Sequence, residues 1–183
     1  ERRIQTSRGY RLPVAVDDFG LGAGSASAEV MRNLAELAEI VRQDLAFSGY
    51  FMIVRFDSLY LTLMGVSELD YQGWSHLGAE YLGTGSATPS GDGFRIVFAL
   101  NSTLQRELIF EKTFTGLWSQ RRQVAHQIAN EIIYYLWGGR TQIFDTKIVA
   151  TRETARGKDL SSFDYDGANL RERTNHGGIN MSP

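Results

Sequence analysis

Two adjacent carboxylates, Asp17 and Asp18, follow a short apolar run at residues 12–16 that is typical of a buried strand. The carboxyl end of a strand is a common place for metal binding or catalysis in α/β proteins. Two carboxylates alone do not define such a site. We therefore expect Asp18 to take part in the hydrogen bonding of a turn.

A glycine-rich segment comes next, with glycines at positions 20, 22 and 24 between the predicted strand and a predicted helix. A dinucleotide-binding loop often occupies this position, because the amides of a helix N-terminus can face a phosphate. The spacing of G-x-G-x-x-G fails, since Ser25 or Ser27 stands at the third position. We expect a plain strand-to-helix connection. Binding of a nucleotide or another anion by the amides of residues 22–27 is the alternative.

The three histidines, His76, His126 and His176, lie 50 residues apart on three different predicted elements. None has a second histidine three or four positions away, so the sequence predicts no metal site. We place His126 on the polar edge of a helix, beside Arg122 and Asn130. The chain contains no cysteine, which excludes thiol catalysis, disulfides and thiolate zinc sites. No G-x-S-x-G elbow of a hydrolase occurs either, so a hydrolase has no support, and no motif indicates a cofactor.

The segment Asp164-x-Asp166-Gly167 resembles the opening of a calcium-binding loop. Ala168 and Asn175 stand where that loop needs a further oxygen ligand and a glutamate, so we expect a hairpin turn instead. A second polar feature is the pair Arg121–Arg122 at the start of a predicted helix. We expect it to lie on a solvated face, and contact with an anionic partner is the alternative.

Two long amphipathic helices must position these residues. The first is predicted over about 27–48, because its apolar residues fall on one helical stripe and Gly49 supplies a stop. The second is predicted over about 119–137, where Val124, Ile128, Ile132 and Leu136 recur at four-residue steps. A short helix capped by Asp70 carries Trp74.

Strands are predicted over 12–17, 50–54, 80–88, 93–101 and 107–115. A crossover helix between the first two favours their parallel pairing, and the short links between the last three favour an antiparallel meander. The fold class is therefore α/β, with a mixed sheet of about five strands and two long helices packed against it.

The character of the chain changes after Gly139. Strands are predicted over 144–150 and 160–165, with a polar turn over 152–159 between them. Two short strands do not form a core of their own, so this part is expected to begin a second unit. The predicted organisation is an amino-terminal arm at 1–11, an α/β domain at 12–140 and the start of another domain at 141–183.

The overall composition narrows the function further. Nineteen basic and 21 acidic residues give a net charge of −2, which argues against a protein that binds nucleic acid through phosphate contacts. No apolar run approaches the roughly 18 residues of a membrane helix, so no direct membrane insertion is expected. The chain begins at Glu1, and we expect that an export signal has been removed.

Several stretches in order resemble the TolB family, a periplasmic component of the bacterial Tol–Pal envelope system. The stretches, which span nearly the whole chain, are Leu12-Pro-Val-Ala-Val-Asp-Asp-Phe19, Ile40-Val-Arg-Gln-Asp-Leu-Ala-Phe-Ser-Gly-Tyr-Phe51, Trp74-x-x-Leu-Gly-Ala-Glu-Tyr-Leu-Gly-Thr-Gly85, Ala125-His-Gln-Ile-Ala-Asn-Glu-Ile132 and Asp164-Tyr-Asp-Gly-Ala-Asn169. Residues 57–67 have no clear counterpart in the family.

The resemblance implies an amino-terminal domain similar to anticodon-binding domains, followed by a truncated first blade of a β-propeller. It also implies a non-enzymatic periplasmic adaptor that links the inner-membrane protein TolA to the outer-membrane lipoprotein Pal during envelope constriction. The family's TolA-recruiting segment matches Glu1, Arg2, Arg3, Ile4, Gln5 and Thr6. Its Pal-binding surface lies in propeller blades that this chain does not include. Another envelope adaptor, such as an activator of cell-wall synthesis with a related fold, is the alternative.

Overall fold

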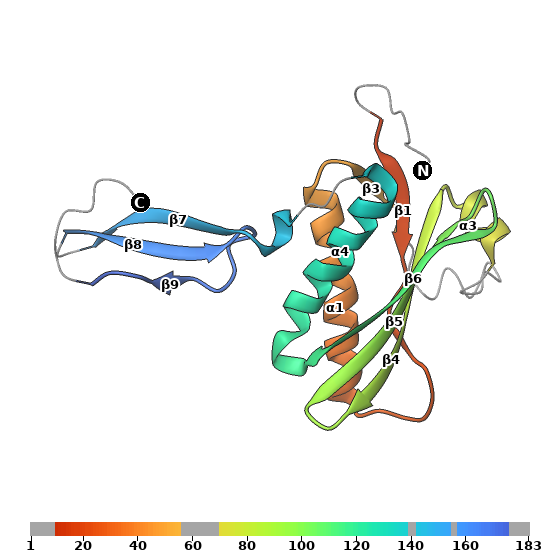
Figure 1. The fold of residues 1–183 in the computed structure, drawn as a ribbon, viewed down its shortest axis with the longest axis horizontal. Coiled ribbons are helices and arrows are strands. Elements are labelled where there is room, and N and C mark those ends of the chain that lie inside the picture. The colour runs from red at the N-terminus through yellow and green to blue at the C-terminus, as the bar shows by residue number, and fades with distance from the viewer. Residues whose placement is uncertain (1–9, 56–69, 139–141, 155–156, 176–183) are drawn as a thin grey trace. The chain divides into compact units, whose positions relative to one another are not determined.

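The structure is a computed structural model that describes residues 10–55, 70–138, 142–154 and 157–175 (Figure 1). Contacts divide the chain into a first unit, Glu1–Arg140, and a second unit, Thr141–Pro183.

The first unit contains a mixed sheet and two long helices, as the sequence predicts. Its strands are β1 (Leu12–Val16), β2 (Gly20–Leu21), β3 (Phe51–Ile53), β4 (Tyr81–Ser90), β5 (Gly93–Ser102) and β6 (Glu107–Leu117). Its helices are α1 (Ala28–Phe47), α3 (Tyr71–His76) and α4 (Arg121–Trp137), with the 3-10 turn η1 (Trp118–Gln120) before α4. Both long helices and all five predicted strands are present near their expected bounds.

The strand order of the sheet is β3-β1-β4-β5-β6, with the two-residue β2 paired beside β4. Strand β1 runs parallel to both of its neighbours, whereas β4, β5 and β6 form an antiparallel meander. Pro13 is tolerated in the central strand β1 because the pairing with β4 begins only at Val14, opposite Tyr81. The two pairing types follow from the connections, a crossover helix in one case and short turns in the other.

Helices α1 and α4 lie together over one face of the sheet (Figure 1). The apolar stripe of α1 is buried, including Leu34, Leu37, Val41 and Leu45. Ser27 caps this helix by accepting a hydrogen bond from the amide of Val30 at 3.3 Å. A second small cluster, formed by Ala15, Trp74, Ala79 and Leu82, includes the tryptophan of α3. Asp70 caps α3 through the amide of Gly73 at 2.9 Å.

Two glycines of β4 allow aromatic rings to lie directly on the sheet. A side chain at Gly83 would place a Cβ 2.7 Å from the Phe98 ring, and one at Gly85 would place it 2.5 Å from the Phe19 ring. The two rings meet edge to face with centroids 6.0 Å apart. The glycine content of this strand is therefore a packing requirement of the core beneath α1 and α4.

The second unit is a three-stranded antiparallel sheet. Its elements are the 3-10 turn η2 (Ile143–Asp145) and the strands β7 (Lys147–Thr154), β8 (Gly157–Asp164) and β9 (Arg171–Glu172), in the order β7-β8-β9. The rings of Phe144 and Tyr165 are buried and lie 5.3 Å apart.

Two sequence predictions for the second unit are wrong. Phe144 does not begin a strand but lies in η2, where burial of its ring against Tyr165 outweighs its β propensity. The polar run 152–159 is mostly paired strand, with Arg152 opposite Asp159 and Glu153 opposite Lys158. Opposite charges facing each other across the ladder make this polar pairing favourable.

Candidate functional site

The predicted partner-binding residues Glu1, Arg2, Arg3, Ile4, Gln5 and Thr6 lie outside the described residues, as does His176. The described chain begins at Tyr10, whose hydroxyl donates a hydrogen bond to the carboxylate of Glu80. This bond is the main reason why the pKa of Tyr10 is raised. The amide of Leu12 then donates to the carbonyl of Tyr50 at 3.0 Å, which fixes the start of β1. Residues 1–9 therefore lead into an interior strand of the sheet.

The carboxylates at the end of β1 belong to a charge network anchored on α1. Arg42 donates from Nε to the carbonyl of Val16 at 2.8 Å and from Nη2 to Asp18 at 2.5 Å. The amide of Asp18 donates to the Asp17 carboxylate at 2.8 Å, in the irregular segment between β1 and β2. Burial raises the pKa of Asp17. This arrangement joins a strand end to a helix, and the ion pair of Asp18 with Arg42 is a contact that the sequence analysis missed.

Glu39 extends the same network. Its carboxylate accepts from Arg55 at 2.7 Å, from Gln43 at 3.1 Å and from Arg42 at 3.2 Å. Burial by itself would raise the pKa of Glu39, but these hydrogen bonds outweigh it and lower the pKa. The acidic and basic side chains therefore neutralise one another and hold α1 against the sheet.

The backbone of the glycine-rich segment pairs with strand β4 of the sheet. Gly20 and Leu21 pair with β4 as strand β2, and the amide of Gly22 donates to the carbonyl of Ala87 at 2.9 Å. A Cβ at Gly22 would lie 2.9 Å from the Ser86 hydroxyl oxygen. The amide of Val30 is occupied by the Ser27 cap. These bonds favour a structural connection over the anion-binding alternative.

His126 is buried, contrary to its expected place on a polar edge. Only 4% of the residue is exposed, and Nδ1 lies 2.7 Å from Oδ2 of the fully buried Asp44 on α1. The prediction was wrong because the partner comes from another helix, 82 residues away in the sequence. A carboxylate in the apolar stripe of α1, between Val41 and Leu45, was the signal that could have indicated the pair.

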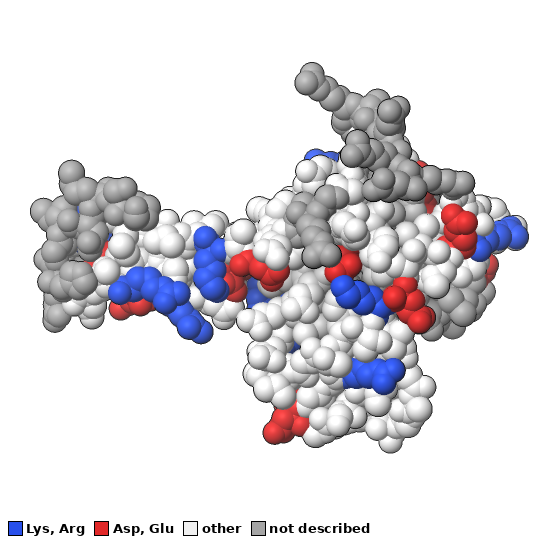
Figure 2. Space-filling view, viewed as in Figure 1, with Lys and Arg blue, Asp and Glu red and all other residues white. Residues whose placement is uncertain are grey.

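Arg121 is also paired across the two helices. Its guanidinium donates to both carboxylate oxygens of Glu36 on α1, at 2.9 and 3.1 Å. The predicted solvated face is therefore an interhelical bridge, which offsets the unfavourable position of this charge at the start of α4. On the face that Figure 2 shows, acidic and basic side chains are scattered, and several of the small groups contain both signs.

The acidic turn of the second unit is a hairpin turn, as predicted. The amide of Gly167 donates to the carbonyl of Asp164, and the amide of Ala168 donates to the Asp166 carboxylate. The Asp164 carboxylate accepts from Lys147 and from Asn169, each at 2.6 Å. Across the described ranges, no group of three or more histidine, aspartate or glutamate side chains is arranged to hold a metal ion. No helix in the described part of the chain is long and apolar enough to span a membrane.

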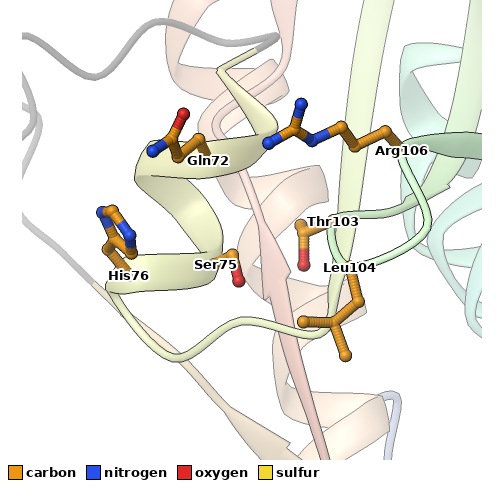
Figure 3. A pocket seen from close by; sticks show the side chains of 6 residues that line it. All are labelled: Gln72, Ser75, His76, Thr103, Leu104 and Arg106. Atoms are coloured by element: carbon orange, nitrogen blue, oxygen red, sulfur yellow. The ribbon is translucent and has the colours of Figure 1, made fainter.

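A hollow of about 210 Å³ lies between α3 and the loop from β5 to β6. Its walls are formed by Gln72, Ser75, His76, Thr103, Leu104 and Arg106. Figure 3 shows Ser75 facing Thr103, the Arg106 side chain extending toward Gln72, and His76 at the far end of the helix. The sequence analysis did not find this group, because its two walls lie about 30 residues apart in the chain.

The family model and the curated relatives that match this chain carry the same family name. A family model described as the TolB amino-terminal domain matches residues 3–109. The Tol-Pal system protein TolB of Pseudomonas putida is 29% identical over 160 residues, covering 85% of this chain and 36% of the relative. The protein of the same name from Cereibacter sphaeroides is 30% identical over 190 residues, covering 99% of this chain and 41% of the relative. The chain thus spans about two fifths of the length of these curated relatives.

A solved structure shows the same fold. The crystal structure of TolB from Acinetobacter baumannii matches with a TM-score of 0.70 and 20% identity, covering 92% of this chain and 39% of that chain. At this identity the likeness concerns the fold alone.

Proposed function

The chain belongs to the TolB family, and from this we propose that it is a non-enzymatic adaptor of the Tol–Pal system in the periplasm. The single observation that carries the proposal is the match of residues 3–109 to the TolB amino-terminal domain. The described site agrees with a scaffold, because Asp18 at the end of β1 pairs with Arg42 of α1, and Glu39 of α1 pairs with Arg42 and with Arg55.

We further propose that residues 1–6 bind the inner-membrane protein TolA. An extended segment can add to the edge of a partner's sheet, where main-chain hydrogen bonds supply affinity and alternate side chains supply specificity. The hydrogen bond between the Leu12 amide and the Tyr50 carbonyl supports this role, because a firmly held β1 offers a rigid base for such an arm.

Titration of the 183-residue chain with the carboxyl-terminal domain of TolA tests this proposal. We expect saturable binding that is lost when residues 1–6 are removed. The variant Arg32→Gln is the matched control, since Arg32 is an exposed residue of α1 far along the chain from the arm. Binding that survives removal of the arm, or no binding by the complete 183-residue chain, would reject the arm as the TolA contact.

We propose that the second unit corresponds to part of a propeller blade of the TolB family. Ile148 lies opposite Phe163 on one face of the sheet, whereas Val149 and Leu160 share the other face. Ile148 and Val149 are 43% and 45% exposed. A sheet with apolar residues on both faces is typical of a blade packed between neighbouring blades.

We propose that the linkage to the lipoprotein Pal is made by propeller blades beyond the part of the family that this chain spans. Titration with the soluble domain of Pal then gives no saturable binding to the 183-residue chain, under the conditions in which TolA binds. Saturable Pal binding would place that contact within residues 1–183 instead.

A further inference from the structure

The loop between β5 and β6 holds an arginine in an unusual backbone conformation. Arg106 has a φ of 56° and lies at the end of the four-residue turn before β6. Glycine adopts this left-handed conformation without cost, and asparagine tolerates it, as Asn169 does in the second unit. An arginine there is held against its own preference. Strain of this kind is a recognised mark of a functional position.

The loop is fixed to the start of β4, so that the Arg106 side chain has a firm base. The amide of Thr103 donates to the carbonyl of Glu80 at 3.0 Å, and its hydroxyl donates to the carbonyl of Ala79 at 2.5 Å. The amide of Gln105 donates to the Ser102 hydroxyl at 3.2 Å. One wall of the hollow is therefore pre-organised by bonds to another element, which lowers the entropy lost on binding.

The side chains around the hollow favour an anionic group. The lining supplies the Arg106 guanidinium, the Gln72 amide and the Ser75 hydroxyl as donors, and it contains no carboxylate. Figure 3 shows the Arg106 guanidinium reaching from the loop toward the helix that carries Gln72 and Ser75. Within the described residues, Arg106 forms no ion pair with an acidic side chain, in contrast to Arg42 and Arg121. A planar guanidinium is suited to bind a carboxylate through two parallel hydrogen bonds.

The rim of the hollow indicates where that carboxylate comes from. Leu104 is 64% exposed beside the polar donors. An apolar rim next to a guanidinium fits a carboxylate that is attached to a polypeptide, because the leucine then covers the neighbouring peptide groups. A free inorganic anion makes no use of Leu104.

We propose that the hollow between α3 and the loop 103–106 binds the carboxylate of an extended peptide, with Arg106 as the residue that pairs with it. This contact is separate from the amino-terminal arm, so it can fail while the TolA proposal stands. It gives the domain a second place to hold a partner protein.

Nuclear magnetic resonance titration of the isotope-labelled 183-residue chain tests the proposal. The probes are N-acetyl-glycyl-leucine, its carboxamide and inorganic phosphate, each at the same ionic strength. We expect saturable shifts at the amides of Gln72, Ser75 and Arg106 with the free carboxylate, and none with the carboxamide. The site is overturned if the carboxylate causes no saturable shift, if the carboxamide binds equally well, or if phosphate alone binds there.

Substitution of the arginine supplies the second arm of the test. Arg106→Gln should weaken carboxylate binding by about tenfold or more, because a charge-assisted bidentate pair is lost. Arg106→Gly removes the same group while suiting the left-handed backbone, so loss of binding cannot then be attributed to a less stable fold. Arg32→Gln should leave binding unchanged. Equal binding by the parent and by Arg106→Gly would overturn the assignment of Arg106.

Discussion

At the scale of single residues, ion pairing and burial act in opposite directions on two neighbouring carboxylates. Asp17 is half-buried at the end of β1, and burial raises its pKa. Glu39 on α1 accepts hydrogen bonds from two arginines, and its pKa is lowered. Stability should therefore respond to the neutralisation of each in opposite ways.

Asp17→Asn should raise the free energy of unfolding at pH 7. A carboxyl group with a raised pKa favours the folded state fully below its ordinary pKa of 3.8, and that contribution is lost as the pH rises through the raised value. The substitution removes the buried charge while an amide oxygen can still accept from the Asp18 amide. Urea unfolding at pH 7 and pH 3 measures the effect, which should nearly vanish at pH 3.

Glu39→Gln is the matched comparison and should lower the free energy of unfolding at pH 7. Its depressed pKa means that the stabilisation is present above the ordinary value of 4.5 and is lost as the pH falls through the lowered value. At pH 3 the difference from the parent should be small. If both substitutions change stability at pH 7 in the same direction, the assigned causes of the two shifts are wrong.

Core packing at Gly85 also depends on a single residue. Gly85→Ala should destabilise the fold by about 1–3 kcal/mol, because the added Cβ meets the Phe19 ring at 2.5 Å in a filled core. Gly20→Ala is the control, since a Cβ at Gly20 meets nothing within 4 Å. The urea concentration at the midpoint of unfolding, measured for both variants, gives the difference in stability, and it should be lower for Gly85→Ala. Equal midpoints would show that the Phe19 ring moves aside without cost.

At the scale of elements, the two long helices are joined by one buried polar pair and one bridge nearer the surface. Asp44 and His126 meet inside the helix pair, whereas Arg121 and Glu36 meet near its surface. Buried pairs are costly to break, because the remaining partner stays in an apolar surrounding. Surface pairs contribute little, since water screens them.

Asp44→Ala should therefore cost about 3–5 kcal/mol of unfolding free energy. The control is Glu131→Ala, which removes the exposed ion pair with Lys112 between α4 and β6 and should cost less than about 1 kcal/mol. Both values come from urea denaturation followed by tryptophan fluorescence. A cost for Asp44→Ala as small as that of the control would mean that the buried pair does not hold α1 and α4 together.

At the scale of the whole molecule, the two units have cores of very different size. The first unit buries the apolar sides of α1, α4 and the sheet, whereas the buried aromatic residues among those described in the second unit are Phe144 and Tyr165. A three-stranded sheet with so small a core is near the lower limit of independent stability. The two units should therefore resist denaturant to different degrees.

Two optical probes can distinguish the unfolding of the first unit from that of the second. All three tryptophans, Trp74, Trp118 and Trp137, lie in the first unit, whereas far-ultraviolet circular dichroism reports the strands of both. In a urea titration, we expect the dichroism to begin changing at a lower concentration than the tryptophan fluorescence. Coincident curves would indicate a single cooperative transition instead.

The sequence by itself determined the family and the long helices and strands of the first unit, but not the short strand β2. Helical stripes, glycine stops and alternating strands are local patterns, so α1, α4 and the β4–β6 meander were predictable from residues close together in the chain. The crossover between β1 and β3 also predicted their parallel pairing. TolA binding by residues 1–6 stays a prediction, since those residues lie outside the described structure.

Only the tertiary structure decided which polar side chains are partners. The sequence predicts His126 at a polar edge, but in the fold it lies buried beside Asp44. Arg106 lines a hollow only because α3 lies across from its loop. The physical reason is that an isolated sequence shows what a side chain is, but its burial, charge partners and backbone strain depend on segments that are distant in the chain and meet only on folding.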